Sequence, residues 1–168
     1  MLRRGVTKAI GWIVPSENPS GVIYGVIVIG ALLAAESGRH ESYLDTVASA
    51  LIAASLYWLA HAYASVLGGR LTDEDRLTGR ALLRALAHDW ALVRGAAIPL
   101  VAIVLAGAVG APQETAVNAG LWSAVASLVA LELIAGIRSR AAPAEIALEL
   151  CVGMTMGLAI LALKIILH

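Results

Sequence analysis

Long apolar segments alternate with short polar ones along most of the chain. A helix needs about 20 mostly apolar residues to cross a bilayer, and five stretches approach that length. They cover residues 20–37, 46–69, 91–110, 115–137 and 143–168. The pattern therefore predicts one all-α domain, a polytopic membrane bundle of five transmembrane helices.

Two proline-containing sites indicate local helix geometry. Asn18 or Ser20 can cap the first stretch, and Pro19 suits an early helical turn. Pro99 lies inside the third stretch, where it is expected to kink the helix or to free a carbonyl that a neighbour must satisfy.

The segment 70–90 is amphipathic, unlike the five spans. Its leucines recur at helical spacing opposite its arginines. The residues concerned are Leu82, Leu83, Leu86, Arg80 and Arg84. We expect a cytosolic or interfacial helix here, either separate from the third span or continuous with it.

Residues 1–19 are expected to form a retained interfacial segment, because their apolar run is too interrupted for a signal peptide.

Composition supports a membrane location and narrows the function. Of the 168 residues, 60% are hydrophobic and 14% charged, which is too apolar for an ordinary soluble domain. Basic and acidic residues balance, so no nucleic-acid partner is expected. No P-loop, dinucleotide fingerprint, HExxH or GxSxG motif is found, which predicts a protein that is not an enzyme and has no cofactor. The only cysteine, Cys151, is expected to be a small core residue.

The distribution of basic residues predicts an orientation. Lys and Arg accumulate in short cytoplasmic segments. With five spans, ten of the twelve basic residues fall on one side: Arg3, Arg4, Lys8, Arg70, Arg76, Arg80, Arg84, Arg94, Arg138 and Arg140. The N-terminus is therefore expected inside and the C-terminus outside, in the inner cell membrane. Lys164 is expected to reach the outer surface.

Polar side chains inside the apolar spans are the candidate functional residues. Tyr57, His61 and Ser65 are each one helical turn apart and form a stripe that must face protein or water. Glu132 and Glu149 lie at a similar depth in the inner half of their spans. Imidazole titrates near neutral pH and carboxylates bind hard cations, so these five residues could bind a small cation or pass protons.

A structural interpretation of the same residues stays open. A histidine between helices often serves only to hold them together, at about 1 kcal/mol. Glu132 could pair with Arg94 or Arg138 near the membrane boundary. Glu145 and Glu149 could owe their place to the helix dipole alone, since both lie near the start of the last span.

Two GxxxG motifs concern helix packing. Gly21 and Gly25 lie in the first span, and Gly153 and Gly157 in the last. Such pairs let helix backbones approach closely, as in a tight bundle or a homodimer.

Two stretches resemble the vacuolar iron transporter-like family of divalent cation exporters. "IYGVIVIGAL" at 23–32 is similar to the first span of that family, and "LAHAYASVLGG" at 59–69 to its second. The resemblance implies five spans, an inside N-terminus and an internal amphipathic segment. It doesn't imply iron chemistry, because Val28, Ala64-Ser65 and Gly68-Gly69 replace the acidic residue, the Ser-Met pair and the Gly-Glu pair of that family.

Two classes of function follow from these observations. The first is a small membrane transporter or channel for a small cation or protons. The second is a non-catalytic accessory or assembly protein that binds another membrane protein or lipid. The lipid bilayer is a partner in both.

Overall fold

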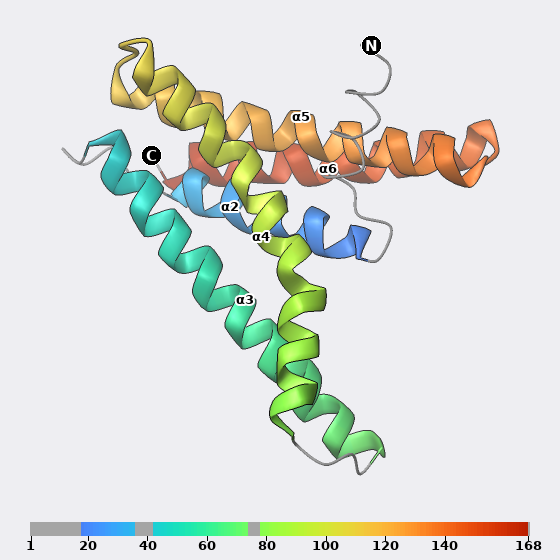
Figure 1. Cartoon of the computed structure of the whole chain (residues 1–168). Coiled ribbons are helices and arrows are strands. Elements are labelled where there is room, and N and C mark those ends of the chain that lie inside the picture. Colours follow the sequence, from blue (N-terminus) through green and yellow to red (C-terminus); the bar gives the residue numbers. More distant parts are fainter. Residues whose placement is uncertain (1–17, 36–41, 74–77, 168) are drawn as a thin grey trace, which may run out of the picture.

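The computed structural model describes residues 18–35, 42–73 and 78–167, and within them the only regular elements are helices. In chain order they are α2 (Pro19–Ala35), α3 (Tyr43–Asp73), α4 (Gly79–Ala108), α5 (Gln113–Ser139) and α6 (Pro143–Leu167) (Figure 1). Helices α3 to α6 are long and apolar enough to cross a membrane, and α2 is a shorter apolar helix of 17 residues. The all-α prediction is confirmed. The interfacial segment predicted at 1–19 lies, apart from Asn18 and Pro19, outside the described residues.

Helix α2 forms the centre of the bundle and packs against α4, α5 and α6 (Figure 1). It is apolar on all sides, as expected for a helix enclosed by others. Its buried side chains reach from one end to the other, and the fully buried ones include Val22, Val26, Ile29 and Leu33. Leu121, Ala124 and Leu128 of α5 and Ile160 of α6 complete the same core.

Asn18 caps α2 as the sequence predicts and also ties it to α4. Its Oδ1 accepts hydrogen bonds from the Gly21 amide and the Ser20 hydroxyl, both at 2.9 Å. Its Nδ2 donates to the His88 carbonyl oxygen at 3.1 Å and to Oδ1 of the buried Asp89 at 3.4 Å. The cap therefore also supplies the hydrogen bond that a buried carboxylate needs.

Two glycines bring α2 and α4 into backbone contact where they cross. A Cβ at Gly25 would overlap the Leu92 carbonyl oxygen, and a Cβ at Gly95 would overlap the Val22 carbonyl oxygen. Each helix thus supplies the small residue against which the other's backbone rests. Gly21 faces Ala91 of α4, so the first GxxxG motif packs within the chain.

The segment 70–90 is not a separate helix, because α3 continues to Asp73 and α4 begins at Gly79. With 31 and 30 residues these helices are about 45 Å long, more than the roughly 30 Å of a hydrocarbon core. The last part of α3 and the first part of α4 form a hairpin that projects from the other helices (Figure 1). Trp58 joins its two arms, donating from Nε1 to the Leu86 carbonyl oxygen at 3.0 Å and meeting Trp90 edge-on at 5.2 Å.

Two predictions about side-chain placement are wrong. Leu82 and Leu86 are partly buried, but Leu83 is 67% exposed, because one residue further turns it about 100° toward the arginine side. Cys151 is exposed as well. It follows Glu149 by two residues, about 200° around the helix, and so lies opposite the α6 face that packs on α5.

Pro99 sits inside a continuous α4, which bends near its middle (Figure 1). The residue is fully buried. Its carbonyl oxygen and the Ile103 side chain pack against Gly120 of α5. The bend lets the second half of α4 follow the bundle, while the first half runs out along the hairpin.

Candidate functional site

Helices α5 and α6 run antiparallel, and each places a glutamate on a glycine of the other. The Glu132 carboxyl group of α5 lies where a Cβ on Gly153 of α6 would be. The Glu149 carboxyl group of α6 lies 2.9 Å from the Cβ position of Gly136 on α5. Gly136 and Gly153 therefore give the two carboxyl groups room between closely packed helices. We call Glu132 and Glu149 the α5–α6 glutamate pair, and Gly136 and Gly153 its glycine seats.

Each carboxyl group of the pair has one oxygen enclosed by protein. In the part of the chain that the structure describes, three buried side-chain oxygens have no hydrogen-bond partner: Glu132 Oε2, Glu149 Oε2 and Thr46 Oγ1. The predicted ion pair of Glu132 with Arg94 or Arg138 is not found among the described contacts; Arg138 is exposed. An enclosed carboxylate oxygen without a donor is costly, so the pair has free capacity for a proton or a cation.

The two carboxyl groups lie near each other, because each rests on a glycine one helical turn from the other glutamate. Glu132 and Gly136, the glycine that receives Glu149, lie one helical turn apart on α5, or about 5.4 Å along its axis. Two carboxylates held this near each other repel, so the doubly ionised state is disfavoured. The arrangement therefore favours a state in which the pair shares one proton or holds a cation between its oxygens.

The two halves of this site share a short repeat that the composition and motif search does not detect. Residues 130–136 read ALELIAG and residues 147–153 read ALELCVG. Each copy has a glutamate and, one turn later, the glycine that seats the other glutamate. The signal was present in the sequence, but its meaning depends on the antiparallel pairing of α5 and α6, since only that pairing brings each glutamate onto the other copy's glycine.

Glu145 has a different role from Glu149, although the two are one turn apart. Its Oε2 accepts a hydrogen bond from the Ala142 amide at 2.9 Å at the start of α6. Glu145 is therefore a helix cap, and the predicted effect of the helix N-terminus accounts for it. Glu149 lies a turn further in and faces Gly136 instead.

The polar stripe of α3 lies apart from the glutamate pair. His61 stacks on Tyr57 with ring centroids 6.0 Å apart, and Tyr24 of α2 lies at 6.2 Å. His61 and Ser65 are exposed, whereas Tyr57 is partly buried. The described residues contain no group of three or more His, Cys, Asp or Glu side chains that could hold one metal ion. His61, Glu132 and Glu149 therefore do not meet in a single metal site.

The second GxxxG motif belongs to the same helix pair as the glutamates. Gly153 receives the Glu132 carboxyl group, and Gly157 receives the Val125 side chain of α5. Both glycines are buried within the chain. This motif thus serves the contact between α5 and α6.

Lys164, at the other end of α6, points to α5. Its Nζ donates a hydrogen bond to Oδ1 of Asn118, and the side chain is partly buried. The two residues line a shallow pocket together with Leu121, Trp122, Leu161 and Ile165. The cation is thus held by an amide near the end of the helix pair, and its contact with the outer surface stays a prediction.

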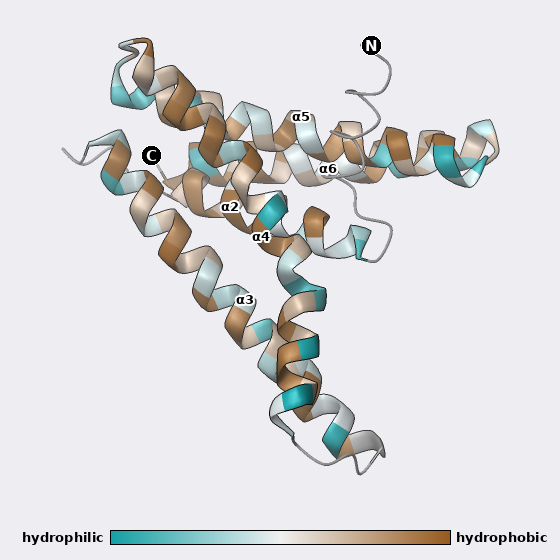
Figure 2. Cartoon of the chain, viewed as in Figure 1, coloured by the Kyte–Doolittle hydropathy of each residue, from teal (hydrophilic) through white to brown (hydrophobic). Residues whose placement is uncertain are grey.

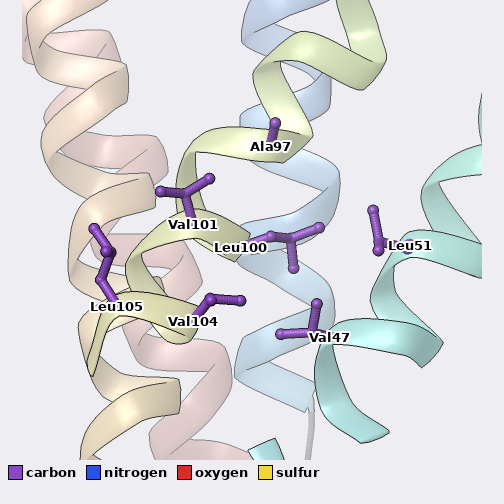
Figure 3. Close-up of a pocket in the computed structure, with 7 residues that line it drawn as sticks. All are labelled: Val47, Leu51, Ala97, Leu100, Val101, Val104 and Leu105. Carbon is purple, nitrogen blue, oxygen red and sulfur yellow. The ribbon is translucent and has the colours of Figure 1, made fainter. Parts of the chain in front are cut away.

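An open apolar groove lies between α3 and α4 (Figure 3). It has a volume of about 280 Å³ and is lined by Val47, Leu51, Ala97, Leu100, Val101, Val104 and Leu105. Every lining side chain is aliphatic, so the groove suits an acyl chain or an apolar helix but has no group that would bind an ion.

Comparison with protein-family models, with curated proteins and with solved structures finds no match for this chain. The resemblance to the vacuolar iron transporter-like family therefore stays a prediction from the sequence.

Proposed function

We propose that this protein spans the inner membrane five times, with its N-terminus inside, and moves protons or a small cation through the α5–α6 glutamate pair. The observation that carries the proposal is the reciprocal seating of Glu132 and Glu149, each with an enclosed oxygen that lacks a hydrogen-bond partner among the described residues. Ionisable residues inside membrane spans are costly and mark ion paths in many transporters.

The helix arrangement is compatible with that topology. Successive helices run in alternating directions, as in a chain that crosses a bilayer repeatedly (Figure 1). Apolar residues dominate α2 and α6, while hydrophilic residues recur along the first half of α4 (Figure 2). The 17 residues of α2 span about 25 Å, which suffices for a crossing if the flanking residues reach the boundary.

A proton is the favoured ion. Two carboxyl groups supply too few ligands for a divalent cation, which usually takes six or more oxygen ligands, whereas one shared proton neutralises the repulsion between them. A monovalent cation with retained water is the second possibility. His61 takes no part at the pair, and its contact with Tyr24 and Tyr57 supports the interpretation that it holds α3 against α2.

The test is proton flux in vesicles that contain the purified protein. An imposed pH gradient should decay faster with wild-type protein than in empty vesicles, and Glu132→Gln, Glu149→Gln and the double variant should reduce that excess at least tenfold. Glu114→Gln is the matched control, because Glu114 is an exposed carboxylate in the first turn of α5. Glutamine keeps the shape and removes the charge, so the thermal midpoint of the variants should stay constant or rise.

Gly153→Ala tests the seat while keeping both carboxyl groups. The new Cβ would occupy the position of the Glu132 carboxyl group, so flux should fall although no ionisable group is lost. His61→Ala completes the set and should leave flux nearly intact. Loss of flux in His61→Ala with normal flux in Glu132→Gln would move the ion path to α3.

The accessory role remains the alternative, and the apolar groove between α3 and α4 is the observation that favours it. Wild-type protein that moves neither protons nor monovalent or divalent cations would refute transport. The groove would then be the better guide to function, as a place where another membrane protein or a lipid chain docks.

A further inference from the structure

Three basic side chains form an exposed row on the first half of α4. Arg80, Arg84 and His88 are one helical turn apart, and all three are exposed. Leu83 borders the row, about 60° around the helix from Arg80 and about 100° from Arg84, and is 67% exposed. We call these four residues the basic stripe of the hairpin.

The stripe is unfavourable for the helix itself. Arg80 lies in the first turn of α4, where the helix dipole disfavours a positive charge, and that turn has no acidic residue. Basic residues one turn apart also repel each other. Within the described part of the chain, no carboxylate contacts the arginine side chains; Asp89 is buried and bonded to Asn18. Among the described residues, the exposed stripe is therefore open to a negative partner from outside the chain.

The surroundings of the stripe indicate what that partner is. The hairpin carries Trp58 and Trp90 in contact with each other, and Trp90 is 44% exposed. Tryptophan is enriched at the boundary between hydrocarbon and headgroups. An exposed leucine flanked by arginines fits that boundary too, because leucine enters the acyl layer while guanidinium groups reach phosphates.

We propose that the basic stripe binds the phosphate headgroups of anionic phospholipids, with Leu83 inserted below them, and so anchors the α3–α4 hairpin on the membrane surface. Guanidinium groups bind phosphates through paired, charge-assisted hydrogen bonds. In the proposed orientation the hairpin faces the cytoplasm, where anionic lipids attract basic segments near the membrane. The inference uses the proposed membrane placement but not ion transport, so either can fail without the other.

The test measures lipid selectivity by electron paramagnetic resonance. The protein is reconstituted in phosphatidylcholine with a trace of spin-labelled phosphatidylglycerol or spin-labelled phosphatidylcholine, and the immobilised fraction gives their relative association constants. Wild-type protein should prefer phosphatidylglycerol. Replacing Arg80 and Arg84 by Gln should lower that preference by about threefold to fivefold for each arginine removed. Leu83→Gln should lower it less, because the charges remain.

The control replaces Arg138 and Arg140, two exposed arginines at the turn between α5 and α6, by Gln. This variant should keep most of the selectivity; an equal loss would mean that any basic residue near the boundary suffices, and would overturn the proposal. Unchanged selectivity in the Arg80/Arg84 variant would also overturn it and would leave an acidic protein segment as the occupant. The Arg80/Arg84 variant should remain folded in neutral detergent, with a thermal midpoint equal to or higher than that of the wild type, because the charges unfavourable to the start of α4 are gone.

Discussion

The crossing of α2 and α4 allows a quantitative prediction for Gly25→Ala. A Cβ at this position would overlap the Leu92 carbonyl oxygen and lie 2.8 Å from the Ala96 amide nitrogen. Both are backbone atoms inside a helix, so neither can rotate away. The helices must then separate by about 1 Å to restore ordinary van der Waals distances.

The cost follows from the side chains beside the crossing. Val22, Val26 and Leu92 are almost fully buried there. A gap of about 1 Å removes up to half of the dispersion energy of the contacts across it, and overpacked cores lose about 1–3 kcal/mol. Alanine is the better helix former by about 1 kcal/mol, which offsets part of this cost. The net destabilisation is expected to be about 1 kcal/mol.

The assay is reversible unfolding in mixed micelles with an increasing fraction of dodecyl sulfate, followed by helical circular dichroism. Gly79→Ala is the control, because Gly79 begins α4 with no atom near its Cβ position, and its stability should stay the same or rise slightly. The double variant at Gly25 and Gly95 should cost little more than the worse single variant, since one separation accommodates both methyl groups. A Gly25→Ala protein within about 0.5 kcal/mol of wild type, or full additivity in the double variant, would refute the backbone contact.

Two other predictions concern the cap of α2 and the orientation of the chain. Asn18→Ala should lower the free energy of unfolding by about 2–3 kcal/mol in the same assay, because it removes a helix cap and leaves the buried Asp89 without its donor. Asn18→Asp should be no more stable than Asn18→Ala, because it brings a second carboxylate next to Asp89. In a Cys151→Ala background, a cysteine at Ser42 should react with a membrane-impermeant maleimide in intact cells and one at Gly79 should not, and the reverse pattern would invert the proposed topology.

The positions of the helices could be read from the sequence because they depend on local properties. Apolar length and composition predict five helices, and each predicted span lies within or overlaps a helix of the structure. The cap at Asn18 is equally local, since its side chain bonds the Gly21 amide three residues away. The sequence also places Glu132 and Glu149 at similar depth, because rise per residue converts spacing into height along a helix.

Tertiary structure alone decided which side chains share a site. The sequence predicts for His61 a depth similar to that of the glutamates, but His61 lies on α3 beside Tyr24. The register of α5 against α6 brings Glu132 onto Gly153 and Glu149 onto Gly136. Spacing along one helix says nothing about the rotation of that helix against its neighbours. That rotation is set by close backbone contacts, such as those at Gly25 and Gly95, whose partners lie tens of residues away in the chain, so single-helix periodicity could not predict the site.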